Sequence, residues 1–104
     1  MTKFIEVITT FETLDEARKM AKLIVENKFG ACCSIQEIES LYRWKDNIGT
    51  AKEFQLTIKT AEKLYSNLEA FILNNHSYET PQILSLPILA GSKLYMKWLY
   101  EATK

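Results

Sequence analysis

Two long strand-like segments separated by a short turn constrain the fold of this chain more than any other feature. The first covers residues 31–45, and the second returns with Phe54, Leu56 and Ile58 alternating against polar residues. Between them, residues 46–49 have the composition of a turn. A strand of about 12 residues spans roughly 40 Å, whereas a helix of about 15 residues spans roughly 22 Å. We therefore expect a hairpin that extends beyond the helices available to cover it.

A strand and then a helix are predicted before this hairpin. Residues 4–9 are rich in β-branched and aromatic types, which favours a strand buried on both faces. Residues 13–16 match the capping box, in which Thr13 and Glu16 satisfy each other's backbone N–H groups at a helix start. Gly30 lacks a Cβ and suits a helix C-terminus, so we expect the first helix to end near it.

A second helix and a second strand are predicted after the hairpin. Thr60 has a side chain suited to an N-cap, and apolar residues follow it at helical spacing. Residues 74–81 have the composition of a loop, and residues 83–89 form the last strand. Pro87 cannot donate a backbone hydrogen bond, which places this strand at an edge of the sheet. Residues 91–92 then begin a short final helix.

The predicted order of elements defines the fold class. Strand, helix, strand, strand, helix, strand is typical of an α+β protein with a ferredoxin-like βαββαβ sandwich. Both helices are expected on one side of an antiparallel sheet, with an extended central hairpin and an added C-terminal helix. Because the chain has 104 residues and no linker or repeat, residues 1–104 are expected to form a single domain.

The protruding end of the hairpin carries the large apolar side chains of Leu41, Tyr42, Trp44 and Ile48. Side chains of this kind stabilise a structure by about 1.5–3 kcal/mol each when they are buried. Because a bare apolar ribbon would promote aggregation, we expect the hairpin to pack on a neighbouring copy in a closed ring. The alternative is that the strands are shorter or curl back over their own sheet.

Charge and composition exclude several classes of partner. The 13 basic and 13 acidic residues give a formal net charge of 0, whereas nucleic-acid binding requires a basic excess. No apolar run reaches the roughly 18 residues of a transmembrane helix, and no signal-peptide pattern is present. Cys32 and Cys33 are the only cysteines, and adjacent residues of a strand point to opposite faces. We therefore expect a reduced, cytoplasmic protein without nucleic-acid or membrane partners.

The common motifs of catalysis, such as a glycine-rich phosphate loop or a nucleophile elbow, are absent from the sequence. A cysteine nucleophile needs a base, and His76 is the only histidine. No third group that would orient such a pair can be identified. The other interpretation is that one cysteine lies in the core and the other at a surface or cleft. No enzymatic activity is expected.

Side chains that could bind a ligand are few. His76 and Glu79 are close in sequence, but a tight transition-metal site usually takes three or four ligands. A site shared between subunits could recruit more, or His76 could simply form hydrogen bonds within its loop. Lys59 stands at a strand end beside Thr60, where it could bind an anion or be an ordinary solvated lysine.

Several short stretches form a pattern from Val7 to Leu99, which is nearly the whole chain. They are Ala31-Cys32, Ser40-Leu41-Tyr42-Arg43-Trp44, Ile58-Lys59-Thr60, His76-Ser77-Tyr78-Glu79-Thr80-Pro81, Leu86-Pro87-Ile88, Ala90-Gly91 and Tyr95-Met96-Lys97-Trp98-Leu99. Each is a weak signal alone. In this order, however, they resemble the CutA family of divalent-cation-tolerance proteins.

The resemblance implies a homotrimer whose long hairpins lie across neighbouring subunits, with Leu41, Tyr42 and Trp44 at the interface. It also implies a role in the tolerance of copper and other divalent cations. No cofactor is obligatory; weak binding of copper, another divalent cation or a small ligand is expected in clefts between subunits. The expected cleft residues are Cys32, Lys59, Tyr78 and Glu79, with His76 as the metal ligand.

This sequence departs from the copper-binding members of the family at two places. Those members supply a cysteine near the end of the first strand and paired histidines in the later loop. Thr9 and Asn75-His76 occupy the corresponding places here. Because these soft ligands are missing, copper binding by that ligand set is not expected.

The same resemblance leaves a second function open. The family architecture is similar to that of the trimeric PII signalling proteins, which suggests a module that binds a small anion or nucleotide near Lys59 and Thr60. Acylphosphatases also share this kind of fold. Their glycine-rich anion loop is replaced here by residues 9–12, Thr-Thr-Phe-Glu, so the analogy of fold does not support that activity.

Overall fold

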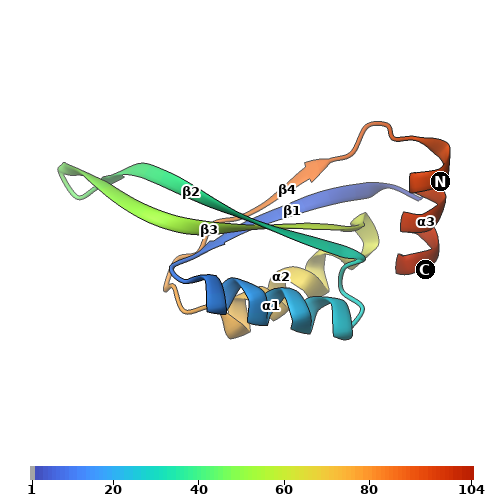
Figure 1. The fold of residues 1–104 in the computed structure, drawn as a ribbon, viewed down its shortest axis with the longest axis horizontal. Helices are drawn as coiled ribbons and strands as arrows, with labels where there is room; N and C mark the ends of the chain where they lie inside the picture. The colour runs from blue at the N-terminus through green and yellow to red at the C-terminus, as the bar shows by residue number, and fades with distance from the viewer. Residues whose placement is uncertain (1) are drawn as a thin grey trace.

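The structure, a computed structural model, describes residues 2–104. Its elements follow the order β1 (Phe4–Phe11), α1 (Leu14–Glu26), β2 (Cys32–Trp44), β3 (Asn47–Ala61), a 3₁₀ turn (Glu62–Leu64), α2 (Tyr65–Asn75), β4 (Ile83–Pro87) and α3 (Lys93–Thr103). The strands form one antiparallel sheet in the order β2-β3-β1-β4, and α1 and α2 lie on one side of it (Figure 1). The predicted ferredoxin-like sandwich is therefore confirmed, including the edge position of β4.

The core lies between the sheet and these two helices. Val7 on β1 and Leu56 and Ile58 on β3 alternate with residues on the opposite face, and none of the three has exposed surface. Burial of apolar area of this kind is the main term that stabilises the fold. The buried cluster comprises Ile5, Val7, Phe11, Ala17, Met20, Ile24, Leu56, Ile58, Leu68 and Ile72.

Helix α1 begins as the sequence predicts, with one difference in detail. The backbone N–H of Glu16 donates to Thr13 Oγ1 at 3.2 Å, which satisfies one of the free N–H groups at the helix start. The reciprocal contact joins the two side chains, because the Thr13 hydroxyl donates to Glu16 Oε1 at 3.0 Å. The carboxylate thus contacts the hydroxyl rather than the backbone of the capping residue.

The prediction that Gly30 ends this helix is wrong. Helix α1 ends at Glu26, and the chain reverses at Lys28, whose φ of 62° lies in the left-handed region. The left-handed residue is therefore a lysine. Gly30 is instead required by packing, because a Cβ there would lie 2.6 Å from Ile58 Cγ2 on β3. The glycine allows the loop after α1 to approach the sheet.

The central hairpin is one uninterrupted ladder. Consecutive pairs extend from Cys32–Lys59 to Trp44–Asn47, and the connecting loop is only Lys45 and Asp46, with a left-handed φ of 52° at Lys45. The turn predicted at 46–49 is thus wrong in position, because residues 47–49 already pair within β3. The hairpin projects well beyond α1 and α2 (Figure 1), and the molecule measures 46 × 25 × 22 Å.

Thr60 does not cap the second helix. Strand β3 continues to Ala61, which pairs with Phe4, so Thr60 has an extended backbone. Its hydroxyl donates to the carbonyl oxygen of Phe29 at 2.8 Å and joins the end of β3 to the loop after α1. Helix α2 follows the 3₁₀ turn and begins at Tyr65 without a side-chain cap.

The C-terminal helix α3 packs against β3 and buries Leu99. The backbone N–H of Tyr95 donates to Ser92 Oγ at 3.3 Å, which confirms the predicted helix start. Strand β4 is shorter than predicted and ends at Pro87. None of the helices in residues 2–104 has both the length and the apolar character needed to cross a bilayer.

Candidate functional site

One row of side chains crosses the face of the sheet that α1 and α2 leave open. Cys32 on β2 pairs with Lys59 on β3, and Lys59 pairs with Glu6 on β1, so the three side chains share a face. Lys59 Nζ lies 3.9 Å from Glu6 Oε1. The structure thus brings together two predicted cleft residues, Cys32 and Lys59, and adds Glu6. Sequence reasoning missed Glu6 because strand register is not visible in a single sequence.

The two cysteines lie on opposite faces, as predicted, and are not joined by a disulfide. Cys33 packs against the core, and its Sγ lies 3.9 Å from the carbonyl oxygen of Ala21. Burial raises the pKa of the Cys33 thiol to about 12, with a further contribution from Cys32. Cys33 is therefore a protonated thiol at neutral pH, a poor nucleophile and a poor metal ligand.

A second cluster surrounds His76, where α2 ends. The imidazole stacks on Phe11, with ring centroids 4.3 Å apart and an angle of 9° between the planes. Its Nε2 lies 2.9 Å from the carbonyl oxygen of Thr10 and 3.2 Å from Thr9 Oγ1. Its Nδ1 accepts a hydrogen bond from the backbone N–H of Tyr78 at 3.1 Å. Both ring nitrogens therefore have partners within the chain.

These partners define the protonation of the ring. A carbonyl can only accept, so Nε2 carries the hydrogen, and a backbone N–H can only donate, so Nδ1 is unprotonated. Burial lowers the pKa of His76 from its ordinary 6.5 and outweighs the opposite effects of the Thr10 hydrogen bond, Glu16 and Glu53. A metal could bind this imidazole only if one of the hydrogen bonds broke. In this hydrogen-bonded state neither nitrogen of His76 is free to bind a metal.

Tyr78 connects the loop after α2 to the base of the hairpin. Its hydroxyl donates to Glu53 Oε2 on β3 at 2.8 Å, and its ring lies 5.0 Å from the His76 ring. Burial, together with the hydrogen bond to Glu53, raises the pKa of Tyr78 well above its ordinary value. The hydroxyl therefore stays protonated and remains a donor to the carboxylate.

In one protomer, the predicted cleft residues fall into two separate groups. Cys32 and Lys59 are adjacent, but Tyr78 contacts Glu53, and positions 53 and 59 are about 20 Å apart along an extended strand. Glu79 is exposed beside Tyr78. Within residues 2–104, no three His, Cys, Asp or Glu side chains gather closely enough to hold a metal ion. A cleft containing all four predicted residues therefore needs a second protomer.

Large apolar side chains are exposed along the projecting hairpin. Leu41 is 65% exposed, Trp44 61% and Ile48 77%, and Tyr42 packs edge-on against Trp44 with ring centroids 6.5 Å apart. The ribbon does not curl back over its own sheet, so that alternative is wrong. The side chains predicted for an interface are thus available to another molecule.

A second exposed apolar area lies on and before α3, and sequence reasoning missed it. Leu89 is 91% exposed, Leu94 83% and Trp98 46%. Leu99, the residue after Trp98, is buried and faces the core. The signal was present, because Leu94 and Trp98 are four residues apart and share a helix stripe that Leu99 flanks.

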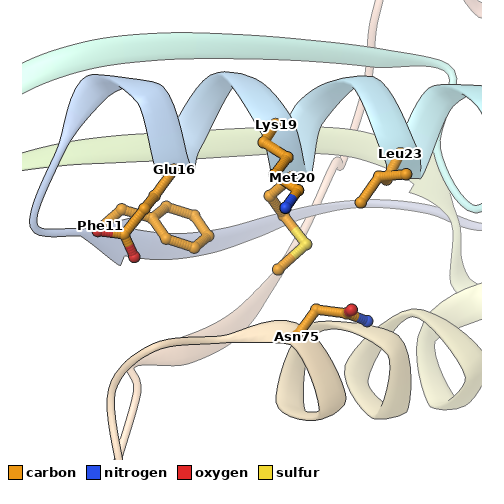
Figure 2. A pocket seen from close by; sticks show the side chains of 6 residues that line it. All are labelled: Phe11, Glu16, Lys19, Met20, Leu23 and Asn75. Atoms are coloured by element: carbon orange, nitrogen blue, oxygen red, sulfur yellow. The ribbon is translucent and has the colours of Figure 1, made fainter.

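A small pocket of about 230 Å³ lies on the helical side of the molecule (Figure 2). Side chains of α1 reach toward the end of α2 across it (Figure 2). Its lining residues are Phe11, Glu16, Lys19, Met20, Leu23 and Asn75. No sequence pattern indicates this pocket, because its walls come from three separate elements.

Comparison with known proteins assigns the chain to a family. The family model described as CutA1 divalent ion tolerance protein matches residues 5–102. The chain belongs to this CutA1 family. The structure of CutA from Synechococcus elongatus superposes with a TM-score of 0.95 at 32% identity, covering all of this chain and 93% of that one. The resemblance found in the sequence is thereby confirmed.

Other CutA proteins differ in length and in compartment. The chloroplastic CutA of Arabidopsis thaliana is 36% identical, and the match covers 96% of this chain but only 56% of that protein. The periplasmic divalent cation tolerance protein CutA of Archaeoglobus fulgidus superposes with a TM-score of 0.91 at 34% identity, covering both chains completely. Because these relatives occupy different compartments, family membership does not assign one, and a cytoplasmic location stays a prediction.

Proposed function

We propose that this CutA1-family chain acts as a homotrimer. The observation that carries the proposal is the exposed apolar surface of Leu41, Trp44 and Ile48 on a hairpin that its own helices do not cover. The register places Leu41 and Ile48 on one face of the ribbon and Trp44, beside Tyr42, on the other. Exposed apolar side chains gathered in this way mark interaction sites. Strand β2 is moreover an edge strand along its whole length, with one side of its backbone unpaired. A neighbouring copy would cover both features.

In this trimer, clefts between protomers bind a divalent cation such as copper, or a small ligand, weakly. Cys32 and Lys59 of one protomer and the loop of Tyr78 and Glu79 of the next supply the side chains. The separation of these two groups within one protomer supports a shared cleft, because neither group forms a site alone. The role is binding within divalent-cation tolerance rather than catalysis, with no obligatory cofactor and no nucleic-acid or membrane partner.

A PII-like anion site near Lys59 and Thr60 has less support. Glu6 lies beside Lys59 and offsets its charge, and the Thr60 hydroxyl is occupied by the carbonyl oxygen of Phe29. An anion would have to displace both interactions. Phosphate or nucleotide that copurified with the protein would nevertheless favour this second function.

Native mass spectrometry of the unstripped protein tests the proposal most directly. We expect the mass of three chains, with metal or a small ligand bound to part of the population. A monomer at micromolar concentration would contradict the trimer. A tightly bound ion present in every trimer would show that the site holds ligands beyond those named above.

Calorimetric titration with copper tests the cleft, and the adjacent cysteines provide matched variants. Wild-type affinity is expected in the micromolar range or weaker, about −8 kcal/mol or less favourable. Cys32→Ser should weaken binding at least tenfold. Cys33→Ser should not, because that thiol faces the core and its pKa of about 12 keeps it protonated. Equal binding by wild type and Cys32→Ser would place the site elsewhere.

A further inference from the structure

The pocket between α1 and α2 combines an apolar wall with charged groups. Phe11 and Met20 are only 1% and 3% exposed, and both belong to the buried cluster of the core. Half-buried Leu23 extends this wall along α1. Glu16 and Lys19 also line the pocket, and their side chains extend from α1 on the side that faces the end of α2 (Figure 2). A ligand here would meet an apolar surface and two opposite charges.

The two charges are not paired with each other. Glu16 and Lys19 are three residues apart on α1, a spacing at which opposite charges attract each other across one helix turn. Among residues 2–104, however, neither side chain takes part in an ion pair. The Thr13 hydroxyl donates to Glu16 Oε1, which leaves Oε2 as a further acceptor. Both charges are therefore available to a ligand.

Asn75, at the C-terminal end of α2, supplies the polar group of the opposite wall. Its Nδ2 donates to the carbonyl oxygen of Phe71 at 2.8 Å, which orients the side-chain amide. The amide oxygen Oδ1 remains as an acceptor. The pocket thus offers an ammonium group two acceptors, from Glu16 and Asn75, and offers a carboxylate one cation, Lys19.

The size of the pocket limits the ligand. Its volume of about 230 Å³ corresponds to roughly eight water molecules at about 30 Å³ each. Pockets for drug-sized ligands are larger, with about 300–1,000 Å³. The pocket therefore suits a molecule of roughly ten non-hydrogen atoms or fewer, which excludes a nucleotide.

We propose that this pocket binds a small zwitterion with an apolar side chain, of the class of the free aliphatic α-amino acids. The ammonium group binds Glu16 Oε2 and Asn75 Oδ1, and the carboxylate binds Lys19 Nζ. The aliphatic side chain covers Met20 and Leu23. A purely apolar ligand would cover both charges without pairing them, which is unfavourable. A simple anion or cation would leave one of the two charges unmatched.

The site is separate from the proposed function. It lies on the helical side of the molecule, whereas Cys32 and Lys59 lie on the face of the sheet that the helices leave open. The proposed trimer uses the hairpin and the edge of β2, so it requires no part of this pocket. Failure of either proposal would leave the other standing.

An NMR titration of metal-free protein with L-leucine tests the site. Metal is left out because amino acids themselves chelate copper. The Met20 methyl signal and the Asn75 side-chain amide should shift and saturate, with a dissociation constant of about 1 mM, as expected for a ligand of so few atoms. The Met96 methyl group, on α3 and outside the pocket, should not shift.

Two analogues of leucine separate the contributions of its charges. L-Leucinamide lacks the carboxylate, and 4-methylpentanoate lacks the ammonium group. Each should bind about three- to fivefold more weakly than leucine, because partly exposed charge pairs contribute modestly. Equal binding of all three compounds would mean that only the apolar wall is recognised, and this result overturns the proposal. A Met20 signal that does not saturate below about 20 mM leucine also overturns it.

Matched variants assign each charge to its residue. Glu16→Gln keeps a side chain that suits the helix start, and should weaken leucine binding about three- to fivefold without weakening that of 4-methylpentanoate. Lys19→Gln should weaken binding of leucine but not of leucinamide. Asp15→Asn and Lys22→Gln remove the same charges from exposed positions of α1 outside the pocket, and should bind leucine as the wild type does. Unchanged leucine binding by Glu16→Gln or Lys19→Gln would overturn the assignment.

Discussion

The two ends of the β2–β3 ladder have the same backbone pairing but different surroundings. At the base, β1 pairs with β3 as far as Phe54, and Leu56 and Ile58 have no exposed surface. Toward the tip, β2 and β3 pair only with each other, and Ile48 is 77% exposed. The register is continuous through both regions. The difference lies in the third strand, β1, and in what the side chains contact.

This comparison shows that strand pairing and core formation are separate requirements. A two-stranded ribbon is marginally stable in water, because its hydrogen bonds largely replace bonds to solvent. The base obtains its stability from α1 and α2. The tip has no equivalent within the protomer, so it must obtain one from a neighbour if the proposed trimer is correct.

Trp44→Glu, at the tip of the hairpin, should have the largest effect of these substitutions. In the proposed trimer it buries an unpaired carboxylate, which costs about 3–5 kcal/mol and dissociates the assembly at micromolar concentration. Sedimentation velocity should find a monomer. Lys22→Glu also adds a carboxylate, but on the exposed side of α1, and should leave the trimer intact. A trimeric Trp44→Glu protein would show that the interface lies elsewhere.

Ile58→Ala and Ile48→Ala remove the same atoms from the base and from the tip. Ile58→Ala should lower the free energy of unfolding by about 2–5 kcal/mol, because it leaves a cavity in a closed core. Ile48→Ala should cost more in the wild-type background than in the dissociated Trp44→Glu background. Urea unfolding followed by circular dichroism measures both. An equal cost for Ile48→Ala in both backgrounds would mean that the tip finds its contacts within one protomer.

Lys28 and Lys45 both have a left-handed backbone, one near the base and one at the tip, and substitutions there should have smaller effects. A residue other than glycine in this conformation costs about 1–2 kcal/mol. Replacement by glycine removes this cost but lowers the free energy of unfolding by roughly 0.5–1 kcal/mol, because the unfolded chain gains conformational entropy. Lys28→Gly, at a φ of 62°, should therefore stabilise the base by about 0.5–1 kcal/mol. Lys45→Gly should gain less, because it also removes the ammonium 5.8 Å from the Trp44 ring. Thermal unfolding ranks the two, and a destabilised Lys28→Gly protein would contradict the left-handed backbone there.

The sequence predicts the elements well because their signals are local. Period-two and helical spacing locate the strands and helices, and the caps at Thr13 and Ser92 form within four residues of chain. Gly30 and Thr60 were misread because distant contacts override their local preferences. Thr60 stays extended since β3 pairs with β1 to its end, and Gly30 is required by Ile58 on another element.

The candidate site is less predictable for the same reason. Cys32 and Lys59 were identified from family-like stretches, but their neighbour Glu6 follows only from register. The two partners of His76 Nε2 are 66 and 67 residues away in sequence. The hydrogen bond from Tyr78 N–H agrees with the alternative that His76 bonds within its loop. A single sequence contains no signal that the imidazole will also stack on Phe11 and bond to β1.

The strand order has a consequence for how the chain folds as it is synthesised. Strand β1 leaves the ribosome first, yet Phe4 pairs with Ala61 and Thr9 with Ile83, so this central strand waits for residues made much later. Strands β2 and β3 need only close the loop of Lys45 and Asp46, a fast and local event. The hairpin with the most exposed apolar surface can thus form before the strand that holds its base is paired. During translation, an early ribbon would expose the apolar side chains of its tip while the rest of the sheet is still incomplete.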